Sequence, residues 1–305
     1  MTGVIQLTTL LLLIATHAAK AQGNPRQLTQ DNSSSRSPSW SPDGSHIAFE
    51  SDRNGNWDIY VLDVLTAQAS VLTTSPASDR YPAWSPDGEH LVFVSDRRGE
   101  PDLHLLQLSS GQVRRLAPMR GEELFPAWSP DGHRIGFTLR EEETFRLMTL
   151  SLENLLPTPL LPIPGRDLWL RWSPGGNRIV FFSRRDTEGE DDEIYLLNVP
   201  TGFLTRVTNR RGHDFCPAWN PEGTRLVFVS VNLDGTRALR VVDALGGSEV
   251  AQMAEGYHRV TEPSWSPDGR FIAYAAIPTP GGSYQLYVEP VSWGRALTGK
   301  EGGGD

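Results

Sequence analysis

Acidic side chains recur at one position of a repeated pattern, five residues before four of six regularly recurring tryptophans. The residues at this position are Ser35, Asp79, Glu123, Asp167, Asp214 and Val260. Three residues before each tryptophan stand Ser37, Tyr81, Phe125, Trp169, Cys216 and Glu262. Carboxylates beside aromatic rings suit a basic peptide, an amine or a cation. The alternative is structural, because carboxylates in turns commonly accept hydrogen bonds from backbone N–H groups.

Both interpretations stay open at the level of the sequence. In the first, these side chains form the mouth of a central channel and bind a protein or peptide partner. The residues expected there are Asp79, Arg80, Tyr81, Glu123, Phe125, Asp167, Trp169 and Asp214. In the second, the carboxylates hold neighbouring repeats in register, with the nearby arginines Arg80, Arg166 and Arg211 able to neutralise them.

Two other groups of residues could do chemistry. The segment from Asp52 to Asp63 resembles a calcium-binding loop, but Trp57 stands where such loops need glycine and Asp63 replaces the usual glutamate. His213 lies near Cys216, yet a nucleophilic Cys–His pair needs close geometry, and a single cysteine is commonly a buried small hydrophobe. The acidic run at residues 186–193 has no ordered ligand spacing and is typical of a solvated loop. We therefore predict no catalytic residue, metal or cofactor.

The element that must position these residues is a long repeat. Its tryptophans are separated by 44, 44, 44, 47 and 46 residues and are Trp40, Trp84, Trp128, Trp172, Trp219 and Trp265. A Ser-Pro-Asp-Gly turn, or a close variant, follows each tryptophan, with proline and glycine at the positions that a tight turn requires. A period of this length indicates an array of supersecondary units.

Strand signals fill each unit. Large apolar residues stand seven and nine positions after every tryptophan, on one face of a strand, and a third and a fourth strand follow. Four strands per unit and six units predict an all-β, six-bladed β-propeller of four-stranded antiparallel blades, with the six tryptophans in its structural core. In such a meander the Ser-Pro-Asp-Gly turns share one face of the disc, and the variable inter-blade loops share the other, where binding is usual.

The ends of the repeat leave its closure open. Fourth-strand patterns occur both at residues 26–29, before the first unit, and at residues 295–298, after the last, so seven of them serve six blades. Either one blade is stitched from both ends of the chain, or the C-terminal end completes it alone. Closing the ring removes the exposed sheet edge that would invite aggregation.

Composition bounds the remaining possibilities. Residues 1–21 are predicted to be a secretory signal peptide, residues 22–298 the propeller, and residues 299–305 a disordered tail. A net charge of −9 argues against nucleic acid as a partner. With one cysteine no disulfide can form within the chain, and we expect a monomer without a membrane span after processing.

The repeats at residues 38–52 and 82–96 resemble those of TolB, the periplasmic propeller of the Tol-Pal envelope system. The resemblance implies a periplasmic protein whose channel mouth, at the loops of Asp79, Glu123, Asp167 and Asp214, receives a protein such as a peptidoglycan-associated lipoprotein. TolB also carries an α/β domain ahead of its propeller, for which the segment between Gln22 and Arg26 leaves no room. The same repeat occurs in oligogalacturonate lyases and in accessory propellers of serine peptidases.

These observations lead to one main expectation. The chain is predicted to be a periplasmic or secreted, non-enzymatic binding module that docks a protein or peptide on the face carrying the inter-blade loops. The alternative is an enzyme or an enzyme accessory, namely a polysaccharide lyase or a propeller associated with a serine peptidase. A third possibility is a purely structural domain without a specific ligand.

Overall fold

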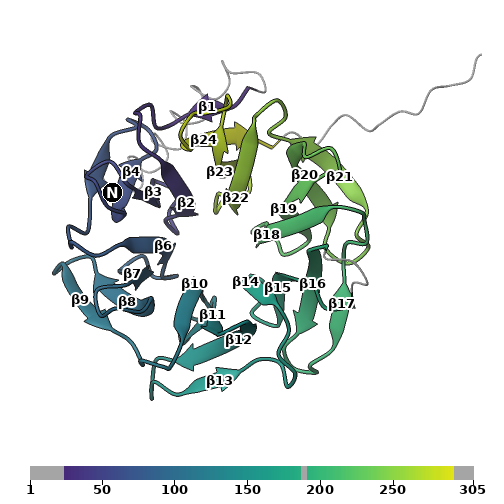
Figure 1. Ribbon diagram of the computed structural model, residues 1–305, viewed down its shortest axis with the longest axis horizontal. Helices are drawn as coiled ribbons and strands as arrows, with labels where there is room; N and C mark the ends of the chain where they lie inside the picture. The colour runs from purple at the N-terminus through teal and green to yellow at the C-terminus, as the bar shows by residue number, and fades with distance from the viewer. Residues whose placement is uncertain (1–23, 187–190, 292–305) are drawn as a thin grey trace, which may run out of the picture.

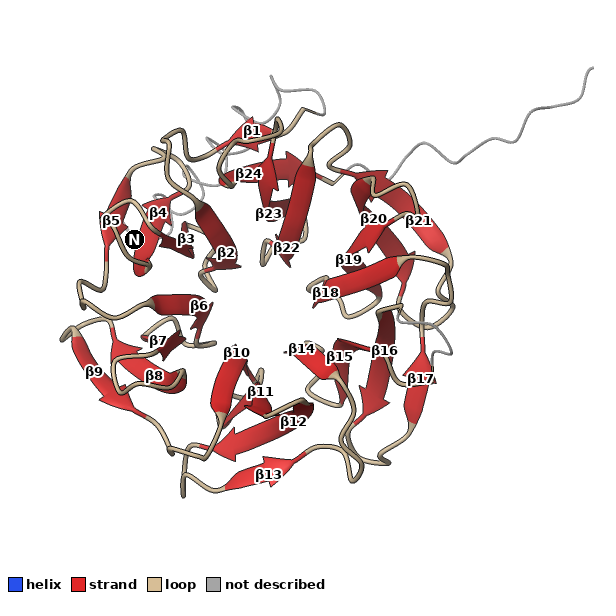
Figure 2. Cartoon of the chain, viewed as in Figure 1, coloured by secondary structure: helices blue, strands red, loops and turns tan. Residues whose placement is uncertain are grey.

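The computed structural model describes residues 24–186 and 191–291, and every regular element in these ranges is a β-strand. Six four-stranded sheets form a ring around a central axis, each standing with its first strand nearest the axis and its fourth at the rim (Figure 1; Figure 2). The predicted all-β, six-bladed propeller of antiparallel blades is therefore confirmed. No helix in the described ranges could cross a membrane.

Three blades occupy the first half of the chain. The first blade consists of β2 (Ser35–Trp40), β3 (His46–Ser51), β4 (Asp58–Asp63) and β5 (Ala69–Val71). The second consists of β6 (Asp79–Trp84), β7 (His90–Ser95), β8 (Asp102–Gln107) and β9 (Gln112–Arg115). The third consists of β10 (Glu122–Trp128), β11 (Arg134–Glu141), β12 (Thr144–Ser151) and β13 (Pro157–Pro159).

The other three blades follow in the same order. The fourth consists of β14 (Asp167–Trp172), β15 (Arg178–Ser183), β16 (Glu193–Asn198) and β17 (Leu204–Arg206). The fifth consists of β18 (His213–Trp219), β19 (Arg225–Val231), β20 (Arg237–Asp243) and β21 (Glu249–Met253). The sixth consists of β22 (Arg259–Trp265), β23 (Phe271–Ile277), β24 (Gln285–Pro290) and β1 (Arg26–Gln27).

The ring is closed by a strand from the N-terminal part of the chain. β1 pairs antiparallel with β24, Arg26 opposite Val288 and Gln27 opposite Tyr287. The sixth blade is thus stitched from both ends of the sequence, the first of the two alternatives. The competing fourth-strand pattern at residues 295–298, the predicted signal peptide and the predicted tail lie outside the described residues.

The core lies between adjacent blades. The aromatic residues nine positions after each tryptophan are at most 1% exposed: Phe49, Phe93, Phe137, Phe181, Phe228 and Tyr274. Small or branched residues of the neighbouring sheet pack against such rings, as Ala48 and Ile59 of the first blade do against Phe93 of the second. Large side chains facing small ones allow the sheets to interdigitate at the density of a protein interior.

A β-bulge interrupts the first strand of every blade. The pairing of β6 with β7, for example, shifts register between Arg80 and Ala83. The residue at the bulge, three before the tryptophan, has a positive φ of 51–60° in all six blades, although none is glycine: Ser37, Tyr81, Phe125, Trp169, Cys216 and Glu262. Such a conformation is unusual for these residue types and costs energy. Its effect is to re-aim six side chains around the channel.

Candidate functional site

The four repeat carboxylates lie inside the protein instead of at an open mouth. Asp79 and Asp167 are fully buried, and Glu123 and Asp214 are at most 3% exposed. Both oxygens of Asp79 lie 2.9 Å from the Arg97 guanidinium. Asp167 accepts a hydrogen bond of 2.7 Å from the Ser183 hydroxyl and forms an ion pair with Arg185.

Glu123 links two blades through backbone groups. Its carboxylate accepts hydrogen bonds from the backbone N–H of Leu103 at 2.8 Å and of Met119 at 2.9 Å, and Leu103 belongs to the second blade. Burial raises the pKa of Glu123 to about 7. Burial also raises the pKa of Asp214. Of the four, Glu123 makes the backbone contacts between blades that the structural alternative describes. Asp79 and Asp167 instead pair with Arg97 and Arg185 of their own blades.

The channel instead holds two ion pairs that also fix the bulges. Glu50 accepts hydrogen bonds from the Arg80 guanidinium at 3.0 Å and from the backbone N–H of Tyr81 at 2.8 Å. Glu262 makes the same pair of contacts to Arg36 at 2.9 Å and to the backbone N–H of Ser37 at 2.7 Å. Each carboxylate thus accepts a hydrogen bond from the backbone N–H of the bulge residue in the next blade, where the backbone is strained. Arg80, expected at a partner-binding mouth, is committed to this contact.

Aromatic residues from three consecutive bulges meet in the channel. The ring centroids of Tyr81 and Phe125 are 4.7 Å apart, and those of Phe125 and Trp169 are 5.1 Å apart. The facing bulges carry Cys216, Glu262 and Ser37, none of them more than 7% exposed. The channel is therefore apolar and aromatic on one side and polar on the other.

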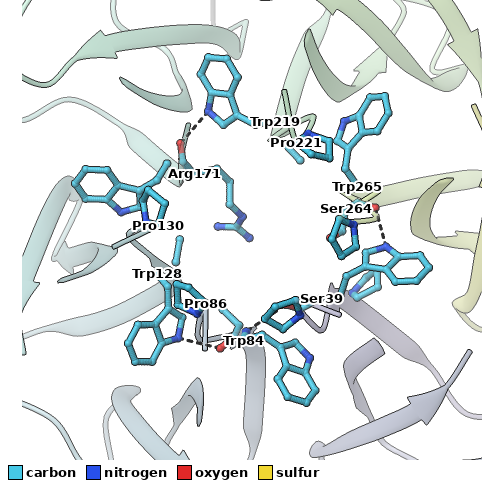
Figure 3. A pocket seen from close by; sticks show the side chains of 18 of the residues that line it. Ser39, Trp84, Pro86, Trp128, Pro130, Arg171, Trp219, Pro221, Ser264 and Trp265 are labelled. Carbon is cyan, nitrogen blue, oxygen red and sulfur yellow. Dashed lines mark hydrogen bonds between the residues drawn. The ribbon is translucent and has the colours of Figure 1, made fainter. Parts of the chain in front are cut away.

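The six repeat tryptophans wedge between blades near the Ser-Pro-Asp-Gly turns. The indole Nε1–H groups of Trp40, Trp128 and Trp219 donate to backbone carbonyls of the preceding blade at 3.1–3.2 Å, namely those of Ser264, Ala83 and Arg171 (Figure 3). Trp172, Trp219 and Trp265 are 7–8% exposed, whereas Trp40, Trp84 and Trp128 are partly exposed. The tryptophans thus belong both to the core between blades and to the lining of the channel.

A cavity of about 360 Å³ occupies the half of the channel next to the turns. Its lining runs from the bulge residues Ser37, Tyr81, Trp169 and Glu262 to the turn prolines, and it includes all six repeat tryptophans. Of the residues predicted to bind a partner, Tyr81 and Trp169 contribute to it. Arg80, Phe125 and the four carboxylates do not.

Arg171 is one residue that the sequence prediction missed. It stands one position before Trp172, where the other five blades have Ser39, Ala83, Ala127, Ala218 and Ser264, and its guanidinium projects into the cavity (Figure 3). Burial lowers the pKa of Arg171 to about 10, so it stays protonated at neutral pH. If the six repeats are aligned with one another, this position holds one arginine and five small residues. That difference could have identified Arg171 from the sequence.

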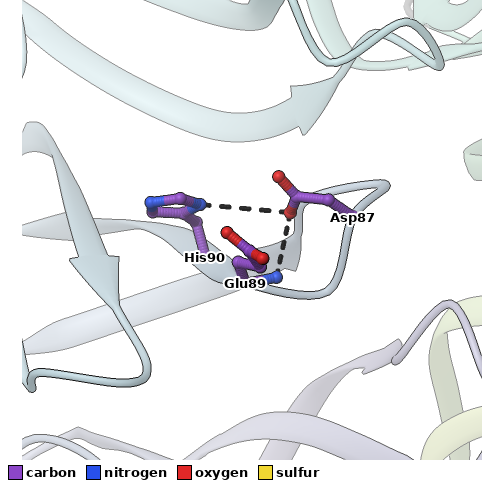
Figure 4. A group of neighbouring side chains, drawn as sticks. All are labelled: Asp87, Glu89 and His90. Carbon is purple, nitrogen blue, oxygen red and sulfur yellow. Dashed lines mark hydrogen bonds and ion pairs between the residues drawn. The ribbon is translucent and has the colours of Figure 1, made fainter.

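Within the part of the chain that the structure describes, one group of side chains has the spacing of metal ligands. Asp87, Glu89 and His90 lie together at the turn of the second blade (Figure 4). Asp87 accepts the backbone N–H of Glu89 at 2.9 Å, and Asp131 and Asp268 cap the turns of two other blades in the same way. The turn therefore accounts for the position of these three side chains.

The remaining candidates separate in space. Asp52 caps the backbone of Ser34, and Asp63 caps that of Thr66 at the opposite end of β4, so the calcium-like segment does not fold around one point. His213 contacts Asp192 at 3.1 Å, whereas Cys216 is buried at its bulge, where burial raises the pKa of the thiol. His213 and Cys216 thus have different contacts, and the structure does not show them as a pair.

The sequence profile of the family described as "TolB beta propeller domain" matches residues 14–155 and 168–299. The chain belongs to this family. The match covers the blades that form the cavity, and it agrees with the resemblance inferred from the repeats.

Solved structures show the same fold. A putative TolB from Agrobacterium tumefaciens superposes with a TM-score of 0.67 at 22% identity, covering 88% of this chain and 94% of that one. An oligogalacturonate lyase in complex with manganese superposes with a TM-score of 0.62 at 16% identity, covering 90% and 94%. The Bacillus subtilis protein named "Uncharacterized peptidase YuxL" is 27% identical over 88 residues, which are 29% of this chain and 13% of that protein. The chain thus spans only a small part of this curated relative.

Proposed function

We propose that this TolB-family propeller is a non-enzymatic binding module of the periplasm or of the outside of the cell, and that it docks a protein or peptide. The observation that carries the proposal is the cavity beside the Ser-Pro-Asp-Gly turns. Proline and tryptophan make up much of its wall, and its charged lining residues are Arg171 and Glu262. Aromatic anchoring surfaces of this kind are typical of binding sites. Glu262 is already held by Arg36 and Ser37, so the described lining residues offer no free acid–base pair.

Exposed apolar side chains favour the same face of the disc. Among the described residues, five of them lie in the turns between third and fourth strands, which share a face with the cavity: Leu65, Leu155, Leu156, Phe203 and Leu245. The face of the inter-blade loops, which the sequence favoured, carries Ile163 and Leu233. We therefore place the docking surface on the face of the turns. The family resemblance suggests a lipoprotein associated with peptidoglycan as one partner, and it would place that partner on the opposite face, that of the inter-blade loops.

Photo-cross-linking from two sides of one blade tests this placement. Leu245 is 71% exposed on the face of the turns and Leu233 is 74% exposed on the opposite face, both in the fifth blade. We expect benzoylphenylalanine at position 245, in protein mixed with cell-envelope extract, to yield a distinct partner that position 233 does not. Equal products at both positions, or a product from position 233 alone, would contradict the proposed face.

A catalytic role is the second candidate, because the fold matches that of an oligogalacturonate lyase bound to manganese. Metal analysis of purified protein, with an assay on polygalacturonate, separates the two functions. The binding proposal expects neither stoichiometric metal nor turnover. Manganese bound through His213 or His258, together with cleavage of the polymer, would favour the lyase.

A further inference from the structure

Of the residues that the structure describes, three arginines but only two carboxylates that pair with them lie in or beside the channel. Arg36 is paired with Glu262 and Arg80 with Glu50, at 2.9 and 3.0 Å. No carboxylate of the described residues lies within 4.0 Å of the Arg171 guanidinium. Within the described ranges, Arg171 is thus the channel arginine without an ion pair of its own, and it stands within the cavity wall. Glu262, which pairs with Arg36, also lines this cavity, and its charge acts on Arg171.

The contacts of Arg171 orient it without neutralising it. One terminal nitrogen donates to the backbone carbonyl of Leu170 at 2.8 Å, and the guanidinium lies over the ring of Trp169, 4.5 Å from its centroid. A guanidinium has five N–H donors. Within the described part of the chain the other donors have no hydrogen-bond acceptor. Stacking on Trp169 therefore holds the planar fork in place while leaving it available to a ligand.

The rest of the cavity fits the body of such a ligand. The cavity that the guanidinium enters is lined mainly by alanine, serine, proline and tryptophan. Glu262 is the one carboxylate among the described lining residues, and it is paired with Arg36. The space of about 360 Å³ is that of a small-molecule site. An unpaired charge in such surroundings attracts an anion strongly, because little water competes for it. The planar fork matches a carboxylate, which it can bind through two parallel hydrogen bonds.

We propose that this cavity is a carboxylate-binding site, in which Arg171 receives the carboxylate end of a ligand and the proline and tryptophan wall packs against its apolar body. The expected occupant is the C-terminal end of a peptide chain, and only this choice rests on the proposed function. A free organic acid shares the same chemistry. The site lies on the channel axis and is distinct from the buried carboxylates of the blades.

Calorimetric titration of the purified full chain tests the site with defined probes. They are N-acetyl-Ala-Phe with a free carboxylate, the same dipeptide as its C-terminal amide, benzoate, and inorganic phosphate. We expect the dipeptide acid to bind at least about tenfold more tightly than its amide. The variant Arg171→Gln should bind the acid no better than the amide and should leave the amide's affinity unchanged. Arg171→Lys should fall between the two, because it keeps the charge and loses the fork.

A matched control is Arg114→Gln, which removes one exposed guanidinium from β9 and should leave every affinity unchanged. Binding of benzoate but not of the dipeptide, lost in Arg171→Gln, would support the carboxylate site and assign it to a small acid. Equal binding of acid and amide, undiminished binding of the acid by a folded Arg171→Gln, binding of phosphate alone, or no binding at about 10 mM would overturn it. Because no partner protein is present, this result is independent of the cross-linking outcome.

Discussion

Replacing Asp167 by alanine should lower the free energy of unfolding by about 3–5 kcal/mol, because it leaves the Arg185 guanidinium without its counter-charge in a mostly buried site. Asp167 is fully buried and Arg185 is 17% exposed, so water can compensate only in part. The Ser183 hydroxyl loses its acceptor as well. Urea unfolding followed by circular dichroism measures the change.

Two further variants make this result specific. Adding Arg185→Ala to Asp167→Ala should cost little more, because the unpaired charge is then gone. Glu153→Ala, which removes an exposed carboxylate from the turn after β12, should change stability by less than about 0.5 kcal/mol. An Asp167→Ala protein as stable as the parent would show that the carboxylate is free, as a partner-binding mouth requires.

Trp219→Ala should be equally damaging, at about 3–5 kcal/mol, since it opens a cavity between two blades. Trp219 packs against Val180 and Ile194 of the fourth blade and against Leu226 of its own, and its indole bonds to the Arg171 carbonyl at 3.2 Å. Thermal and urea unfolding would report the loss.

The conservative change Trp219→Phe keeps most of the packing and loses the hydrogen bond, so it should cost only about 1–2 kcal/mol. Trp84→Ala should cost less than Trp219→Ala, because Trp84 is partly exposed to the channel. If Trp219→Ala cost less than about 1 kcal/mol, the indole would not be a wedge between blades.

The repeat made the fold readable from the sequence. The regular spacing of the tryptophans and the proline and glycine of every turn indicate six four-stranded units. Both signals are local, so contacts between residues distant in sequence are not needed to recognise them. Closure was different, because β1 and residues 295–298 carry the same strand pattern. Which of them pairs with β24 depends on which lies closer to it in three dimensions, and a local sequence pattern does not contain that information.

The candidate site was harder to predict, for a physical reason. In an uninterrupted strand, residues five and three before the tryptophan would share a face. The bulge breaks this alternation, so Asp79 turns into its blade while Tyr81 lines the cavity. The same disruption hides Glu50, whose partner is the backbone of the bulge in the next blade.

Nuclear magnetic resonance of the nine tryptophan indoles, during titration with N-acetyl-Ala-Phe, tests most directly whether ligand enters the cavity beside the turns. Seven tryptophans line that cavity, whereas Trp57 lies outside it against Arg80. We predict that the indole signals of Trp169 and Trp172 shift on addition of the acid, that the Trp57 signal stays in place, and that Arg171→Gln abolishes the shifts. Shifts confined to Trp57, or shifts that persist without Arg171, would contradict the account.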